Sequence, residues 1–100
     1  MLFRSYKIAV FPLLKNKPEL IEKARSVYKV LSTKYYCAWD DRGNIGKRYF
    51  AQDEIGTPWC ITVDFQSLDD STVTVRDRDT AKQERVSIDK LQEYFENELK

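Results

Sequence analysis

The sequence contains no histidine, and it has only two cysteines. Without histidine, the nucleophilic triads that use a histidine base, the histidine proton shuttles and nearly all Cys/His zinc sites are excluded. Cys37 and Cys60 stand alone among apolar neighbours, which is typical of small buried side chains. We therefore expect two buried, reduced thiols on separate strands and neither a disulfide nor a redox pair.

Long apolar runs, repeats and low-complexity segments are also missing. No run approaches the roughly 18 residues needed to cross a bilayer, and the opening residues lack the apolar core and cleavage site of a signal peptide. Hydrophobic residues make up 42% and charged residues 33% of 100 residues, with only three glycines and three prolines. This composition is typical of a folded soluble protein. We expect one domain spanning residues 1–100 and a cytoplasmic location.

The charge is small in total but uneven along the chain. The net charge is +1, yet residues 1–50 hold 11 Lys and Arg against 4 Asp and Glu, whereas residues 51–100 hold 6 against 12. This distribution favours a dipolar surface with a basic side, unless folding interleaves the two halves.

The first half of the sequence predicts a strand, a helix and a second strand. Tyr6–Phe11 is a nearly continuous apolar run that ends at Pro12, as in a central strand. Pro18 suits a first helical position, and apolar residues then recur every three or four positions through Tyr35, which predicts an amphipathic helix. Tyr36–Asp40 predicts the second strand.

The second half predicts two more helices and three more strands. Helix-compatible residues fill Gly46–Ile55 before Gly56 and Pro58. Alternating or β-branched residues predict strands at Trp59–Phe65, Thr72–Arg78 and Glu84–Ile88, with turns at residues 67–71 and in the stretch 76–83. Asp89 and Gln92 form a candidate capping box for a last helix. The apolar positions expected to be buried by that helix are Leu91, Tyr94, Phe95 and Leu99.

These elements predict an α/β fold with a five-stranded mixed sheet covered by three helices. Right-handed crossovers make the first three strands parallel, and the two short connections that follow require hairpins. The simplest arrangement has the strand order 2-1-3-4-5 with strand 4 antiparallel.

Two stretches with many charged and aromatic residues, Gly46–Pro58 and Thr72–Gln83, converge on one edge of such a sheet. The edge would combine guanidinium donors, carboxylate acceptors and aromatic rings, a mixture that binds unpaired RNA bases. Alternatively, the RDRD segment is a cross-strand salt-bridge ladder on a solvated face. The candidate groups are Arg48, Arg76, Arg78, Asp53, Glu54, Asp77, Asp79, Tyr49, Phe50 and Trp59.

The segments GNIGKRYFAQDEIGTPWCITVDF and TVTVRDRDT resemble the C-terminal anticodon-binding domain of glycyl-tRNA synthetases. The resemblance extends from KIAVFPLL to RVSI, which is most of the chain. It implies the five-stranded mixed sheet predicted above and a module that binds the anticodon loop of a glycine tRNA. It also implies that an N-terminal catalytic domain, which this chain lacks, activates glycine with ATP and Mg²⁺.

Transferred residue by residue, the resemblance implies that Arg48 and Glu54 on the second helix and Arg76 and Arg78 on the fourth strand contact the anticodon. Tyr49 and Asp53 are implied to support them. The family commonly has a further basic residue in this helix, where this chain has Ala51.

The resemblance implies no cofactor, metal or catalytic residue within the 100 residues, and the isolated domain is expected to be a monomer with no membrane partner. An accessory or protein-interaction domain with the same fold and no anticodon reading is the alternative function. An independent small enzyme is the third reading, for which the sequence offers no set of catalytic residues.

Overall fold

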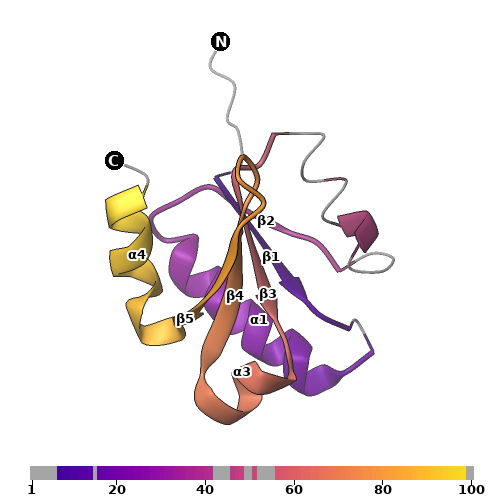
Figure 1. The fold of residues 1–100 in the computed structure, drawn as a ribbon. Helices are drawn as coiled ribbons and strands as arrows, with labels where there is room; N and C mark the ends of the chain where they lie inside the picture. The colour runs from indigo at the N-terminus through magenta and orange to yellow at the C-terminus, as the bar shows by residue number, and fades with distance from the viewer. Residues whose placement is uncertain (1–6, 15, 42–45, 49–50, 52–55, 99–100) are drawn as a thin grey trace.

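The computed structural model describes residues 7–14, 16–41, 46–48, 51 and 56–98 of the chain (Figure 1). The strands are β1 (Ile8–Pro12), β2 (Cys37–Trp39), β3 (Trp59–Val63), β4 (Thr72–Asp77) and β5 (Gln83–Ser87). The helices are α1 (Pro18–Leu31), α3 (Phe65–Asp70), the 3₁₀ helix η1 (Ile88–Lys90) and α4 (Leu91–Glu98).

The sheet has the order β2-β1-β3-β4-β5, as the sequence predicts. β1 pairs in parallel with both β2 and β3, whereas β4 is antiparallel to its neighbours β3 and β5. The register places Cys60 beside Ala9 and also opposite Arg76. Because side chains alternate along a strand, these three residues share one face of the sheet, which we call the open face.

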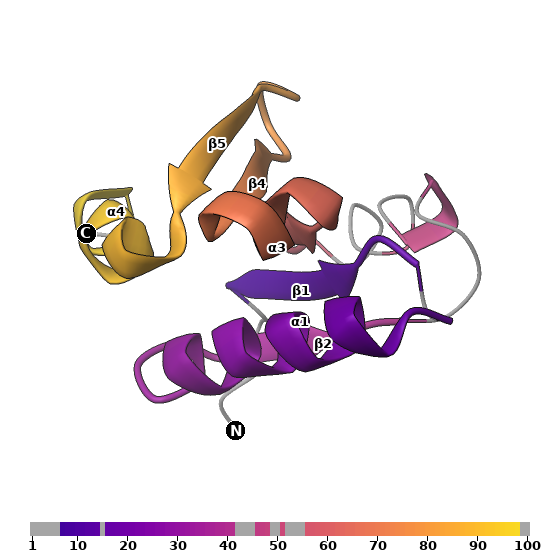
Figure 2. The same ribbon diagram turned by 90° about the horizontal axis from the view of Figure 1, so that it is seen from below.

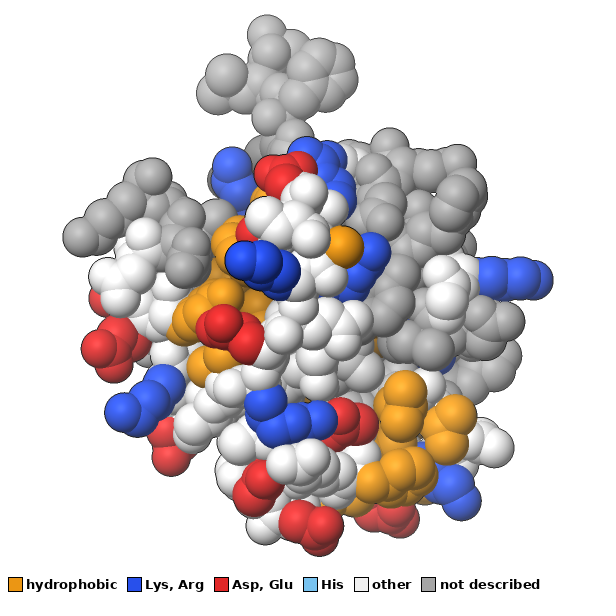
Figure 3. All heavy atoms as spheres, viewed as in Figure 1, with side chains coloured by type: hydrophobic (Ala, Val, Ile, Leu, Met, Phe, Trp, Pro, Cys, Tyr) orange, Lys and Arg blue, Asp and Glu red, His pale blue; other side chains and the backbone are white. Residues whose placement is uncertain are grey.

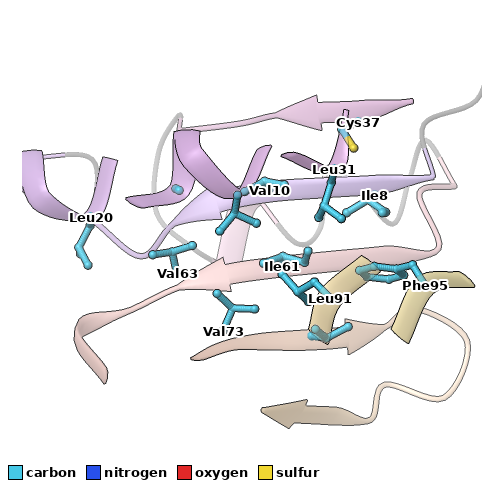
Figure 4. Packing of buried hydrophobic residues seen from close by; sticks show 13 residues of the cluster. Ile8, Val10, Leu20, Leu31, Cys37, Ile61, Val63, Val73, Leu91 and Phe95 are labelled. Carbon is cyan, nitrogen blue, oxygen red and sulfur yellow. The ribbon is translucent and has the colours of Figure 1, made fainter. Parts of the chain in front are cut away.

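The opposite face, which we call the helix face, holds most of the apolar core. Helix α1 lies along it, and α4 covers it near β4 and β5 (Figure 2). The sequence dictates this packing, because α1 buries apolar residues spaced three or four apart, namely Leu20, Ala24, Val27 and Leu31. They pack with strand residues such as Val10, Ile61 and Val73, and with Leu91 and Phe95 of α4 (Figure 4). An exposed ion pair at 2.7 Å between Lys34, in the turn after α1, and Glu96 of α4 also connects the two elements.

The open face has a much smaller apolar cluster. It consists of Ala9, Phe11, Ala38 and Cys60. Both cysteines are buried and neither is in a disulfide, which confirms the prediction from the sequence. Cys37 belongs to the helix-face core and Cys60 to the open-face cluster, so the sheet itself lies between the two thiols. Burial raises the pKa of the Cys37 thiol to about 11, which leaves it protonated at neutral pH.

The predicted turn at residues 67–71 is wrong, because Phe65–Asp70 forms the short helix α3. Asp64 is its N-cap, and the Asp64 side chain accepts a hydrogen bond from the Ser67 N–H at 3.1 Å. The Ser67 hydroxyl in turn accepts from the Asp64 N–H at 3.0 Å. This reciprocal capping box starts a helix that its six residues would not form by propensity alone. Ser71 ends the helix in a left-handed conformation with φ 57°.

The predicted capping box of Asp89 and Gln92 is also wrong. Asp89 lies inside η1, whose N-cap Ser87 makes no side-chain capping bond. The chain instead passes from β5 through η1 into α4, and the Ile88 N–H donates to the Ser71 carbonyl at 2.8 Å. As predicted, Leu91 and Phe95 are buried by α4 and Tyr94 is partly buried, while Leu99 lies outside the described residues.

Of the second helix predicted over Gly46–Ile55, residues 46–48 and 51 are helical, and the other positions lie outside the described residues. Residues 46–48 lie on the side of the sheet away from α1 (Figure 2). Among the described residues, no helix combines the length and the apolar character needed to span a bilayer.

Candidate nucleic-acid interface

The turn between β4 and β5 is organised by Asp77. The Asp77 side chain accepts a hydrogen bond from the Asp79 N–H at 2.8 Å, and the Asp77 carbonyl accepts from the Ala81 N–H at 2.8 Å. The Asp77 N–H donates to the Lys82 carbonyl at 2.9 Å, which closes the hairpin. Ala81 takes a left-handed conformation with φ 57°. An aspartate that bonds the backbone two residues later is a common means of fixing a turn, so this hairpin presents its side chains from a defined backbone.

Arg78 connects the hairpin to the segment that precedes β3. Its N–H donates to the Pro58 carbonyl at 2.9 Å, one residue beyond the β3–β4 ladder. A Cβ added to Gly56, which has φ 82°, would lie 3.2 Å from Arg78 Nη1. Both the backbone conformation and this approach favour glycine there. The structure therefore brings Arg78 together with residues 56–58, as the predicted convergence requires.

The Arg78 guanidinium is partly exposed and lies against an exposed carboxylate. Arg78 Nε and Nη2 donate to Asp79 Oδ1 at 3.2 and 3.1 Å. The side chains of Arg78 and Asp79 are 36% and 72% exposed, so water screens this pair and its net contribution to stability is small. An incoming phosphate can displace Asp79 at little cost. Figure 3 shows Lys and Arg side chains, with carboxylates among them, over the tip of the hairpin at the top of the view.

Arg76 lies two residues earlier, on the open face. Its register partners are Cys60 on β3 and Gln83 on β5, and its side chain is partly buried. Arg76 therefore projects from the last paired positions of β4, whereas Arg78 lies in the hairpin beyond the strand. The two arginines are thus two residues apart along the chain at the same end of β4.

The structure does not bring Arg48 to this edge. The Arg48 side chain is 2% exposed, its Nη1 donates to the Pro12 carbonyl, and its Nη2 donates to the Leu13 carbonyl at 3.2 Å. Its guanidinium carbon also lies 5.8 Å from the centre of the Phe11 ring. These contacts are at the carboxyl end of β1, whereas Arg78 lies at the amino end of β3. The two strands are parallel and paired, so Pro12 and Pro58 are offset by about five residues of strand, roughly 16 Å.

Arg48 lies away from the hairpin because its guanidinium group donates to the backbone carbonyls where β1 ends. The sequence showed a basic residue in a charged helix but gave no sign that its side chain would turn toward the sheet. Tyr49, Asp53 and Glu54, the other predicted residues of this helix, lie outside the described residues, so their roles stay predictions.

A second arginine network, which the sequence reasoning missed, lies at the other end of β4 on the open face. Arg85 pairs with Asp64 at 2.5 Å and donates to Thr72 Oγ1 at 2.9 Å and to Thr74 Oγ1 at 3.3 Å. Asp64 thus caps α3 and binds Arg85 across β4. The D-x-x-S spacing of Asp64 and Ser67, followed by alternating threonines in β4, was the available signal for this network.

The ionisation of Asp64 reflects these contacts. Partial burial alone would raise the pKa of its carboxyl group, but hydrogen bonds from Arg85 and Ser67 outweigh that effect and hold the pKa below its ordinary value. The pKa of Arg85 is raised by the same hydrogen bond to Asp64, against the opposing effect of burial. The pair is therefore fully ionised at neutral pH and serves the fold.

Among the described residues, no group of three or more Cys, Asp or Glu side chains is arranged to hold a metal ion. The charged groups of the hairpin include Arg76, Arg78, Asp77 and Asp79. Charged groups of both signs on a fixed turn can bind phosphate through guanidinium groups and base edges through carboxylates.

The chain is similar to known proteins over most of its length. The family described as "Anticodon binding domain" matches residues 7–98. Relatives named glycine–tRNA ligase include those of Ruminiclostridium cellulolyticum, at 57% identity, and Streptomyces coelicolor, at 54% identity, each over 93 residues. Each alignment covers 93% of this chain and 20% of the relative. The chain therefore spans about a fifth of the length of these curated relatives.

The fold itself is similar to a solved structure. A prolyl-tRNA synthetase from Cryptosporidium parvum, solved with halofuginone and AMPPNP, matches with a TM-score of 0.87 over 94% of this chain and 20% of that chain. At 18% sequence identity, this likeness concerns the fold alone.

Proposed function

Because this chain belongs to the anticodon-binding domain family, we propose that it recognises the anticodon of a glycine tRNA as one domain of a longer glycine–tRNA ligase. The observation that carries the proposal is the identity of 54 to 57% to ligases of this name over 93% of the chain. The same alignments cover only 20% of each relative, so the chemistry of aminoacylation belongs to the remainder of such a protein.

In this proposal the hairpin supplies the phosphate and base contacts. Arg78 exchanges its exposed pair with Asp79 for a phosphate of the anticodon loop, and Arg76 offers a second set of donors on the open face. Glu54 accepts hydrogen bonds from a cytosine amino group, the pairing that carboxylates make with cytosine in nucleic-acid grooves, and glycine anticodons end in two cytosines. Tyr49 and Asp53 support Glu54 from the same segment.

Arg48 receives a different role in the proposal. Since its guanidinium group is buried against the carbonyls of Pro12 and Leu13, it holds the segment that carries Tyr49, Asp53 and Glu54 rather than reaching the RNA. Arg48 is thus a positioning residue whose loss would act through the segment that follows it.

In the longer protein, catalysis and tRNA recognition would belong to different domains. An N-terminal catalytic domain would bind ATP and Mg²⁺ and activate glycine, while residues 1–100 form a single domain that reads the tRNA in the cytoplasm. We expect the isolated chain to be a monomer and to show no glycine-dependent pyrophosphate exchange.

Binding of two anticodon stem-loops tests the proposal. One carries the glycine anticodon and the other has its two cytosines replaced. Arg78→Ala should weaken both loops alike and reduce the salt dependence of binding, since it removes a phosphate contact. Glu54→Gln keeps the shape of the side chain but presents a donor to the base. It should therefore weaken the binding free energy of the glycine loop by about 1–3 kcal/mol and leave that of the other loop unchanged. Binding isotherms at two salt concentrations separate these effects.

The matched control is Lys29→Ala, which removes an exposed positive charge from α1 on the other side of the sheet. It should leave both affinities nearly unchanged. A wild-type chain with no preference for the glycine loop, or a Glu54→Gln variant that keeps the preference, would contradict anticodon reading and favour an accessory role.

A further inference from the structure

A pocket of about 260 Å³ lies between the β4–β5 hairpin and α4. Trp59 and Tyr94 form its apolar walls, and Asp77, Lys82 and Glu84 place charged groups around it. It opens on the helix-face side of the sheet, because Trp59 and Asp77 are register partners one residue away from Cys60 and Arg76. Figure 3 shows an apolar strip between α4 and the hairpin, flanked by acidic and basic side chains.

The walls of the pocket are held in place by the core. The Trp59 ring contacts the Tyr94 ring edge-on at 5.9 Å between centroids, and it contacts Phe95 at 5.8 Å. Phe95 is fully buried, whereas Trp59 and Tyr94 are each only partly buried. The core therefore fixes the orientation of two rings while part of their surface remains accessible to a ligand.

The two acidic side chains of the pocket, Asp77 and Glu84, come from the β4–β5 hairpin. The hydrogen bonds that Asp79 and Thr80 donate to the Asp77 side chain both go to Oδ1, at 2.8 and 3.5 Å. Among the residues that the structure describes, both of these side-chain bonds leave Oδ2 to accept from a ligand. Glu84 is exposed and lies on β5 opposite Val75, which also lines the pocket.

Aromatic walls with carboxylate acceptors suit a planar group that carries hydrogen-bond donors. Unpaired bases stack on aromatic side chains, and carboxylates accept from the exocyclic amino group of cytosine. The volume lies just below the roughly 300 Å³ at which pockets for drug-sized ligands begin, which suits a single small group. Lys82 adds a positive charge beside the pocket for the phosphate of the same nucleotide.

The pocket adjoins the candidate nucleic-acid interface only at Arg78, near the tip of the hairpin. The Arg78 N–H donates to the Pro58 carbonyl, and Trp59 is the next residue along the chain. Because Trp59 and Asp77 alternate with Cys60 and Arg76 along the strands, Arg76 and the pocket lie on opposite faces of the hairpin, and Arg78 lies near its tip. A strand bound at Arg78 has only to pass around the tip for a neighbouring base to enter the pocket.

We propose that the pocket between Trp59, Tyr94, Asp77 and Glu84 binds one unpaired RNA base with an exocyclic amino group, next to the bases read at the hairpin. The inference rests on the proposed function, because it takes the ligand from the same RNA. It adds a second base-binding site, on the helix-face side of the hairpin.

Trp59 fluorescence provides the test, because the chain has only two tryptophans and Trp39→Phe leaves Trp59 as the single reporter. The single-tryptophan chain is titrated with the glycine anticodon stem-loop, with a cytidine trinucleotide and with a uridine trinucleotide. The cytidine trinucleotide should bind at least about fivefold more tightly than the uridine trinucleotide, as measured by quenching of Trp59, because uridine has no amino group. Equal responses to the two trinucleotides, or none, would overturn the proposal.

Glu84→Gln in the same background should reduce the cytidine preference to less than about twofold. Glu84 is exposed, so the variant is expected to fold. The charge-matched control is Asp69→Asn on α3, an exposed residue that does not line the pocket and should leave the preference intact. A cytidine preference that survives Glu84→Gln would contradict the role assigned to the carboxylates.

The remaining outcomes separate the pocket from the proposed function. Stem-loop binding with glycine-anticodon preference but no change in Trp59 fluorescence overturns the pocket and leaves the function standing. A cytidine-specific Trp59 response without stem-loop preference supports the pocket and overturns anticodon reading. A Trp59 response to an arginine-rich peptide and not to RNA assigns the pocket to a basic segment of a protein partner, which also overturns the proposal.

Discussion

The two faces of the sheet carry different kinds of side chain. The helix face packs thirteen buried residues from four strands, α1 and α4 into one cluster, whereas the buried apolar cluster of the open face has four members. On the open face, a buried arginine covers Phe11, and β4 and β5 carry Thr72, Thr74, Arg76 and Arg85 in place of apolar residues. The chain thus concentrates its apolar surface on one side and its hydrogen-bonding groups on the other.

The difference shows where stability and binding can be separated. Apolar burial stabilises in proportion to the area removed from water and needs no precise direction, so the helix face can hold the fold. Polar groups contribute little net stability but bind directionally, so they suit a surface that must recognise a ligand. Arg48 and Arg85 are polar residues of the open face that serve the fold itself, each through hydrogen bonds to specific partners.

The largest expected effect is a loss of stability on the helix face. Ile61→Ala removes a fully buried side chain from the main cluster and should lower the free energy of unfolding by about 2–5 kcal/mol. Cys60→Ala changes the adjacent residue on the same strand but removes a single heavy atom from the open-face cluster, so about 1 kcal/mol is expected. Urea denaturation measures both. Equal losses would show that the two faces contribute alike.

A smaller effect tests whether Arg48 belongs to the fold. Arg48→Met keeps an unbranched side chain over Phe11 but leaves the Pro12 and Leu13 carbonyls without their guanidinium donors, which should cost about 1–3 kcal/mol. Arg78→Ala, at a partly exposed position, should change the unfolding free energy by less than about 0.5 kcal/mol. If Arg78→Ala lowers the free energy of unfolding more than Arg48→Met does, the division into a structural and a binding arginine is wrong.

The smallest effect concerns the pair of Asp64 and Arg85. Asp64→Asn keeps an acceptor for the Ser67 N–H but removes the charge, so it should cost about 1 kcal/mol at pH 7. Because the folded-state pKa of Asp64 is depressed, the stability it contributes is fully present above the unfolded pKa of about 3.9. That contribution is lost as the pH falls through the folded-state pKa.

Denaturation of wild type and Asp64→Asn at several pH values checks this dependence. The difference in unfolding free energy should be constant above about pH 5 and shrink below about pH 4. A difference that stays the same down to the lowest pH would mean that the ion pair contributes nothing and that only the capping geometry matters.

Local patterns in the sequence predicted the sheet order, the long helix α1 and the burial of both cysteines. The spacing of Leu20, Ala24, Val27 and Leu31 is enough to predict α1, because a helix brings residues three and four apart onto one side. Alternation of valines with polar residues predicted β4. The same local reasoning failed at α3, where six residues without helical periodicity depend on hydrogen bonds between Asp64 and Ser67.

The candidate site was predicted in part. Arg78 lies beside residues 56–58 as expected, because strand direction and register follow from connection lengths. Arg48 lies elsewhere because the direction of a long side chain depends on acceptors that are distant in sequence, here the carbonyls at the end of β1. The pocket at Trp59 was not predicted, because its walls come from β3, the hairpin and α4.

The sequence by itself determined which residues face the same side of each helix and strand, and thereby the strand order and the position of the core. These properties depend on periodicity, which is local. The tertiary structure alone decided which arginine binds backbone and which remains partly exposed, and which rings line a pocket. Those outcomes depend on hydrogen-bonding groups and side chains that folding brings together from distant parts of the chain, because a polar group buried by the fold must find a partner wherever the fold places one.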